Sequence, residues 1–248
     1  MQFLGFAMLD TSLSHLAKSR HEEKRLEILR WLSYFHYSTA DILCSLLGIK
    51  NKNIFSKLQK ANLIKSVKTD AIYHDLWLLT RLGLEIAREF VPEAARYSLD
   101  GNRISPRLVR HNLSLQMYLI AQGDKVTKIT PEKCLSFPEV NKLPDALIQV
   151  EGQRVALEIE RNHKSDSRIY MALYGHALAI GKYNYYDVVT YVFPTDTLKF
   201  KYLKLFNCDE WPLYEYVEYR RRYEKRPDTW MIPPDIGLRF NFISSDML

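Results

Sequence analysis

The chain of 248 residues contains little cysteine, glycine or proline. Its three cysteines, Cys44, Cys134 and Cys208, lie far apart, which excludes a disulfide framework, a cysteine zinc site and an iron–sulfur cluster. Nine glycines and ten prolines are too few for a collagen or a flexible linker. No uncharged apolar run approaches the roughly 18 residues that span a bilayer, and the N-terminus lacks a signal-peptide pattern. We therefore expect a soluble cytoplasmic protein without a membrane partner.

The composition is that of an ordinary folded protein with a basic balance of charge. Lysine and arginine number 35 against 29 acidic residues, so the formal net charge is +6 and the pI is about 9.0. At roughly 100–200 residues per domain, the length predicts one large or two small domains. A positive charge of this size permits a polyanionic partner, and its distribution along the chain decides whether one is favoured.

Residues 20–98 predict three helices, a hairpin and a closing helix. Apolar residues at helical spacing indicate helices over 21–34 and 51–61. Between them, Ser38-Thr39 can cap a short helix that ends at Gly48. Asn62 follows the third helix, where a residue of left-handed conformation often ends a helix.

The hairpin and the closing helix complete this region. Strands over 65–68 and 71–79 flank Thr69-Asp70, and a fourth helix is expected to run to residue 90. Residues 57–64, KLQKANLI, and 78–83, LLTRLG, resemble the "LxxxGLI…LTxxG" signature of winged-helix DNA-binding domains. The resemblance implies a winged helix-turn-helix over residues 20–98.

The charge pattern of this region agrees with nucleic acid as a ligand. Between Lys50 and Lys68 there are six lysines and no acidic residue, which suits contact with phosphate. Small polar side chains among them have the size to contact base edges. The alternative is a solvated helix face in a winged helix that binds protein. The candidate DNA-binding residues of this region are Lys50, Lys52, Asn53, Ser56, Lys57, Lys60 and Lys68.

The second half of the chain predicts a separate domain with a mixed α/β sheet, residues 104–248, after a polar linker at 98–102. A helix over 107–122 precedes two strands, 145–150 and 154–160, that form a hairpin turned at Glu151-Gly152. A helix over 165–180 and a β-branched and aromatic strand over 186–193 follow. Such a strand is typical of the buried centre of a sheet.

Three carboxylates belong to the predicted hairpin. Asp145 begins one strand, and Glu158 and Glu160 lie at the end of the other. The two glutamates share one face of that strand because successive side chains alternate between faces. In a hairpin turned at Glu151-Gly152, residues whose numbers sum to about 303 are opposite each other, which brings Asp145 level with Glu158. Like charges this close repel unless a cation joins them. Oxygen ligands alone favour a hard ion, Mg²⁺ or Mn²⁺.

At these positions the chain resembles the PD-(D/E)xK nuclease superfamily, which has the restriction-endonuclease-like fold. Pro144-Asp145, a gap of twelve residues and Glu158-Ile159-Glu160 form the pattern. The resemblance implies that Asp145, Glu158 and Glu160 are metal ligands and catalytic residues. The usual lysine is replaced by Glu160, and Lys164 is the candidate to restore the positive charge. The alternative is that the glutamates are exposed on an edge strand.

Both halves together resemble the plasmid replication-relaxation family, closest to mobilisation relaxases of the MobC type. The resemblance covers residues 20–195 and includes Arg110-His111, 144–147 and 156–161. It implies a metal-dependent, site-specific endonuclease that nicks one strand at an origin of transfer. Arg161, just beyond the carboxylates, becomes a candidate for contact with the DNA backbone. Candidate partners are double-stranded DNA of the origin, single-stranded DNA and an accessory mobilisation or coupling protein.

Two further alternatives stay open at this point. Arginines and tyrosines interleave over residues 214–226, where we expect a helix that either binds single-stranded DNA or packs its tyrosines on the sheet. The alternative to the nuclease is that the whole chain is a winged-helix DNA-binding protein without catalysis, acting in plasmid replication or transcription control. Three convergent acids distinguish the two functions, because only the nuclease needs them.

Overall fold

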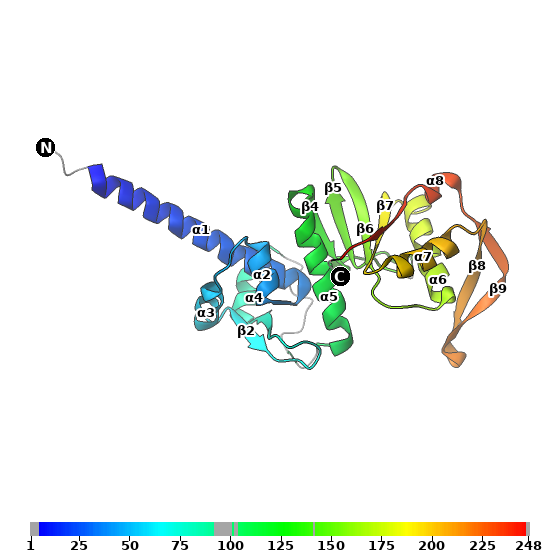
Figure 1. Ribbon diagram of the computed structural model, residues 1–248, viewed down its shortest axis with the longest axis horizontal. Helices are drawn as coiled ribbons and strands as arrows, with labels where there is room; N and C mark the ends of the chain where they lie inside the picture. The colour runs from blue at the N-terminus through cyan, green and yellow to red at the C-terminus, as the bar shows by residue number, and fades with distance from the viewer. Residues whose placement is uncertain (1–4, 92–100, 102–103, 141, 247–248) are drawn as a thin grey trace. The chain divides into compact units, whose positions relative to one another are not determined.

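The computed structural model describes residues 5–91, 101, 104–140 and 142–246, with side chains from residue 19 onward (Figure 1). The chain forms two compact units, residues 1–113 and 114–248. The fold is mixed α+β; its mixed sheet was predicted from the sequence, and it has five strands. Within the described residues, no helix combines the length and the apolar character that a bilayer crossing requires.

The described part of the first unit includes helices α1 to α4 and a three-stranded antiparallel sheet in the order β1-β3-β2. The first helix begins at Gly5, far before the predicted start at residue 21, so 5–20 continue the same helix. The elements of this unit are α1 (Gly5–Phe35), β1 (Tyr37–Thr39), α2 (Ala40–Leu46), α3 (Asn53–Lys60), β2 (Ile64–Val67), β3 (Leu76–Leu79) and α4 (Arg81–Arg88).

Short-range sequence signals fix the ends of these helices. The Thr39 hydroxyl accepts a hydrogen bond from the N–H of Ile42 at 3.3 Å, so it caps α2 as predicted. Asn62 has φ 55, which confirms the expected left-handed residue after α3. Strands β2 and β3 are shorter than predicted, and residues 68–75 connect them in place of a tight turn at Thr69-Asp70.

The two parts of the winged-helix signature lie against each other. The Thr80 hydroxyl donates to the Asn62 carbonyl at 2.5 Å and accepts from the N–H of Gly83 at 3.1 Å. A Cβ at Gly83 would lie 2.0 Å from the Leu63 carbonyl oxygen. Only glycine allows this approach, so the spacing of threonine and glycine has a direct packing reason.

The predicted domain limits, 20–98 and 104–248, stay predictions. The proposed linker lies outside the described residues except for Gly101. Helix α5 (Pro106–Gln122) contains the division between the two units. It begins one residue before the predicted helix over 107–122 and ends at the predicted residue, and Gly123 follows it with φ 56.

The second unit is built on a five-stranded sheet in the order β10-β7-β6-β5-β4. Strand β7 pairs in parallel with both β6 and β10, whereas β4, β5 and β6 pair antiparallel. Glu151 and Gly152 have φ 50 and 83, as the predicted two-residue turn between β5 and β6 requires. The strands are β4 (Val126–Pro131), β5 (Ala146–Val150), β6 (Gln153–Ile159), β7 (Val188–Phe193) and β10 (Phe240–Ser244).

The predicted helix over 214–226 is wrong. The segment belongs to a two-stranded antiparallel ribbon, β8 (Glu210–Val217) and β9 (Arg222–Met231), shown in orange in Figure 1. Pro212 disfavours a helix interior, and tyrosines at alternate positions favour a strand. Arg221, with φ 50, lies in the turn between the strands.

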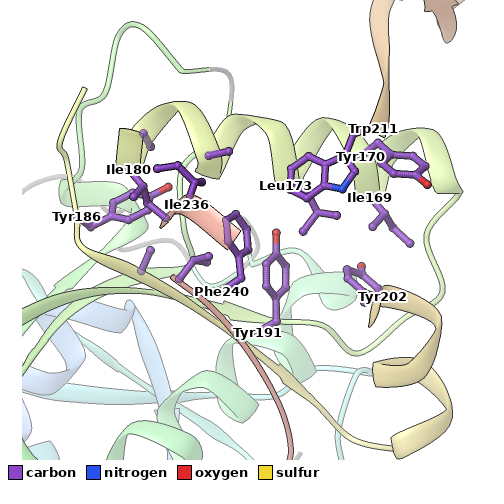
Figure 2. Close-up of a cluster of buried hydrophobic side chains, with 14 of the residues drawn as sticks. Ile169, Tyr170, Leu173, Ile180, Tyr186, Tyr191, Tyr202, Trp211, Ile236 and Phe240 are labelled. Atoms are coloured by element: carbon purple, nitrogen blue, oxygen red, sulfur yellow. The ribbon is translucent and has the colours of Figure 1, made fainter. Parts of the chain in front are cut away.

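Helices α6 (Asp166–Gly181) and α7 (Asp196–Phe206) contribute to the aromatic core of this unit, together with the short α8 (Pro234–Gly237). Figure 2 shows Tyr191 pointing from β7 toward α6, with Tyr202 of α7 beside it. Both tyrosines and Trp211 are fully buried. The indole N–H of Trp211 donates to the Phe206 carbonyl at 3.0 Å, so the ribbon is anchored to this core.

Candidate active site

The register of the β5–β6 hairpin brings Asp145 to Glu158. Ala146 pairs with Leu157, so the residue numbers sum to 303 as the sequence predicted. The N–H of Asp145 donates to the Leu157 carbonyl at 3.0 Å, and its carboxylate accepts from the N–H of Ile159 at 2.7 Å. The Asp145 carboxylate is thereby fixed at the end of β6.

Glu158 and Glu160 are buried, with 1% and 2% of their surface exposed. Strand β6 lies between β5 and β7, so it is not an edge strand. Glu160 continues the ladder, since its N–H donates to the Val192 carbonyl at 2.9 Å. The alternative of exposed glutamates on an edge strand is therefore wrong. A buried carboxylate is costly without partners, so the neighbours of these two residues matter.

Lys142 is the cation closest to Glu158. Its Nζ lies 2.8 Å from Oε1 of Glu158, and it also donates to the Leu143 carbonyl at 2.7 Å. Burial lowers the pKa of Lys142, but the carboxylates of Glu158 and Asp145 outweigh it and hold the pKa above its ordinary value. Lys142 is therefore charged and lies within the field of these two acids.

A buried histidine and a tyrosine complete the surroundings of Glu158. Nε2 of His176 on α6 lies 3.1 Å from Oε1 of Glu158, and Nδ1 lies 2.5 Å from the Tyr186 hydroxyl. Burial, and then Glu158, raise the pKa of Tyr186, so its phenol stays protonated and donates to Nδ1. This assigns the hydrogen on His176 to Nε2, from which it is donated to the carboxylate.

Lys164 contacts Glu160, so the lysine proposed to restore the missing charge does reach this site. Burial raises the pKa of Glu160 against the lowering effect of Lys164, and the Glu158 and Asp145 carboxylates add to the rise. The Lys164 carbonyl accepts from Nζ of Lys201 at 2.6 Å, which fixes the segment before α6. Burial, and then the Glu160 carboxylate, also raise the pKa of Tyr202.

The oxygen donors fit a hard divalent cation in their chemistry, because two buried glutamates and the half-buried Asp145 lie at the ends of neighbouring strands. Asp145, Glu158 and Glu160 are the residues that would hold Mg²⁺ or Mn²⁺. In the described part of the chain, however, no three acidic, histidine or cysteine side chains are arranged as metal ligands. Lys142 and Lys164 contact the two glutamates instead, so a bound ion would have to replace these contacts.

The predicted DNA-binding residues of the first unit are exposed. Helix α3 buries Ile54, Phe55 and Leu58, so its polar side faces solvent. Lys52 forms an ion pair with Asp41 at 2.6 Å. The exposed residues are Lys50, Lys52, Asn53, Ser56, Lys57, Lys60 and Lys68. Arg161 belongs to the second unit, where it follows Glu160 and is half-buried.

Sequence reasoning missed Lys142, His176 and Tyr186. Lys142 lies two residues before Pro144-Asp145. This spacing indicates that Lys142 is near the carboxylates only if the β5–β6 hairpin is already assumed. His176 is a single polar residue within an otherwise apolar stretch of α6, a pattern that favours a hydrogen-bonded core histidine. No feature of the sequence pairs it with Glu158, because α6 packs on the sheet through long-range contacts.

No protein-family model, no curated protein and no solved structure matches this chain.

Proposed function

We propose that the chain is a metal-dependent DNA endonuclease with a separate DNA-binding unit. The main support is the convergence of Asp145, Glu158 and Glu160 at one end of the β5–β6 hairpin, beside Lys142 and Lys164. Buried acids with adjacent lysines on a mixed sheet agree with the PD-(D/E)xK pattern. A metal-binding role accounts for three acids at one strand end more directly than ion pairs with two lysines do.

The element order of the first unit supports a winged helix. Three helices precede the β2–β3 hairpin, and β1 completes a small antiparallel sheet. In this proposal α3 lies in the major groove, and Lys68 in the β2–β3 connection contacts phosphate. The fully exposed Tyr73 in the same connection is a further candidate for contact with DNA.

The residues of the candidate site have distinct proposed roles. Asp145 and Glu158 would hold the ion, together with the Ile159 carbonyl, while Glu160 would be a third ligand or would accept the proton of the attacking water. A bound Mg²⁺ or Mn²⁺ would polarise the phosphate and lower the pKa of a bound water. Lys164 stabilises the negative charge that develops on the phosphate. His176 and Tyr186 orient the Glu158 carboxylate.

The resemblance to MobC-type relaxases directs the proposal to a plasmid origin of transfer. There the protein would nick one strand, with an accessory mobilisation or coupling protein as partner. The chain has no His-x-His pair, so the resemblance is not to relaxases that hold their metal with a histidine cluster.

A non-catalytic regulator of plasmid replication or transcription is the second candidate. The ion pairs favour it, because Glu158 and Glu160 already have lysine partners in this structure. In that case the acids and lysines form a structural network, and only the first unit binds DNA.

The two candidates differ in the conversion of supercoiled origin plasmid to nicked circle. We expect nicking with Mg²⁺ or Mn²⁺ and none with EDTA. Glu158→Gln should abolish nicking without loss of DNA binding, since the amide retains the shape but not the charge. Glu151→Gln is the matched control, because Glu151 is an exposed carboxylate in the turn of the same hairpin. A wild-type protein that binds this plasmid without nicking it would support the regulator.

A further inference from the structure

Two pockets of the second unit share a pair of tyrosines. Tyr216 of β8 and Tyr223 of β9 are register partners, and their ring centroids are 5.3 Å apart in an edge-to-face arrangement. Both side chains line a pocket of about 420 Å³ and a second pocket of about 620 Å³. The two pockets therefore adjoin at this tyrosine pair, and residues of the ribbon and of α6 line both.

The smaller pocket, called here the basic pocket, is lined by Arg168, Arg221 and Arg222. Arg168 comes from the first turn of α6, beside Ser167, and the other two come from the tip of the ribbon. Among the residues that the structure describes, Arg168 and Arg221 form no ion pair, and no acid lines the pocket. Such a pocket attracts a phosphate group.

The larger pocket, called here the aromatic pocket, is lined by Tyr174 and Tyr214 in addition to the shared pair. Met171 and Leu178 of α6 extend its apolar wall. Tyr216 is 54% exposed, so its ring is accessible to a planar ligand. Base stacking on such rings is independent of sequence, because every base has a π-face.

We propose that α6 and the β8–β9 ribbon bind single-stranded DNA, with a phosphate in the basic pocket and a neighbouring base in the aromatic pocket. Duplex DNA does not fit this arrangement, since its bases are stacked on each other and paired. The choice of DNA as the nucleic acid rests on the proposed function. Ser165 of the basic pocket directly follows Lys164, which contacts Glu160, so the pocket and the carboxylate site share adjacent residues of the sequence.

Fluorescence anisotropy with a labelled oligo-dT tests the basic pocket in EDTA, where no cleavage occurs. The Arg168→Ala/Arg221→Ala double variant should bind at least about tenfold more weakly. Its salt slope should fall by about 0.7 for each phosphate that the variant no longer neutralises. Arg220→Ala is the matched control, because Arg220 lies on the same tip, pairs with Glu224 at 2.6 Å and does not line the pocket.

The aromatic pocket has its own variant and control. Tyr216→Ala should weaken oligo-dT binding about fivefold or more. Tyr219→Ala should leave it unchanged, since Tyr219 is 80% exposed and lines neither pocket. Thermal unfolding of each variant verifies that the fold is retained.

Three results would overturn this inference: wild-type affinity in the Arg168→Ala/Arg221→Ala and Tyr216→Ala variants, equal losses in the two controls, or clearly tighter binding of oligo-U than of oligo-dT. The last would identify RNA as the ligand. Because the assay contains no metal, its result is independent of the nicking assay. If the protein binds oligo-dT through these pockets but does not nick the plasmid, the proposed function is refuted and the binding inference stands.

Discussion

Glu158 has two partners at its carboxylate, Nζ of Lys142 at 2.8 Å and Nε2 of His176 at 3.1 Å. Only 1% of the Glu158 side chain is exposed, whereas 29% of the Lys142 side chain is. A buried charge that loses its partner destabilises a fold more than the pair ever stabilised it. The site is therefore sensitive to single substitutions around Glu158.

Replacement of Lys142 tests this pairing. Lys142→Ala should lower the free energy of unfolding by about 3 kcal/mol, because Glu158 would be left buried beside His176 alone. The double variant Lys142→Ala/Glu158→Gln should recover part of that loss, since no unpaired charge remains. Urea unfolding of the four proteins measures both effects. Strict additivity of the two single substitutions would contradict a coupled pair.

At the residue scale, hairpin arithmetic predicted the neighbourhood of Asp145 and Glu158 because the register depends only on the turn. The same arithmetic could not predict that Lys142 or His176 reaches Glu158. Lys142 lies in an irregular segment before β5, and His176 comes from another element, so no periodic pattern places either side chain.

At the element scale, β6 owes its position to pairing on both sides and to an ion pair at its start. Arg154 contacts Asp187 at 2.7 Å, and its guanidinium donates to the Asn184 carbonyl at 2.9 Å. The backbone N–H of Arg154 also donates to Asp187 at 2.8 Å. These contacts join the start of β6 to the segment before β7, at the opposite end of β6 from the acids.

The Arg154–Asp187 pair predicts a pH dependence. Hydrogen bonds from Arg154 hold the pKa of Asp187 below its ordinary value, so the pair stabilises the fold above that value and loses its effect as pH falls through the lowered pKa. Asp187→Asn should cost about 0.5–1 kcal/mol at pH 7, a small figure because both side chains are over one-third exposed. Unfolding at pH 7 and pH 3 should show this difference shrinking with acid. A difference that grows toward pH 3 would contradict the assignment.

Gly83 leaves the least room for a side chain among the described glycines of the first unit. A Cβ there would lie 2.0 Å from the Leu63 carbonyl oxygen, so Gly83→Ala requires a backbone shift at the start of α4. We expect a loss of about 2–3 kcal/mol in the free energy of unfolding, in the range of large single-substitution effects. Arg81→Ala, at a 90% exposed side chain of the same helix, should change it by less than about 0.5 kcal/mol. Equal thermal midpoints for the two variants would refute this packing account.

Element prediction from sequence succeeded where local signals are strong. Thr39, Asn62 and Glu151-Gly152 act through their own backbone neighbourhood, so the helix ends and the hairpin turn follow directly. It failed for β8 and β9, because charged residues around 220–222 mask the alternation of the tyrosines. Strands β4 and β10 were also missed, since their places in the sheet come from pairing with distant segments.

At the scale of the whole molecule, the proposed function requires the first unit to bind duplex DNA and the second unit to cleave a strand. The Lys57→Ala/Lys60→Ala/Lys68→Ala variant should bind duplex DNA more weakly, with the salt slope reduced by about 0.9 for each phosphate that is no longer neutralised. The control Lys125→Ala/Lys128→Ala/Lys133→Ala removes the same charge from exposed positions of the second unit. Anisotropy over a salt series compares them. Equal weakening in both variants would mean that only net charge matters.

In the proposed function, Asp145, Glu158 and Glu160 bind a divalent cation even though lysines contact both glutamates in this structure. Calorimetric titration of the metal-free protein with Mn²⁺ tests it directly. We predict one ion per wild-type chain, retained in Glu151→Gln and absent from both Asp145→Asn and Glu158→Gln, because a hard ion needs several anionic oxygens. Mn²⁺ binding of equal affinity in all four proteins, or none in the wild type, would contradict the account.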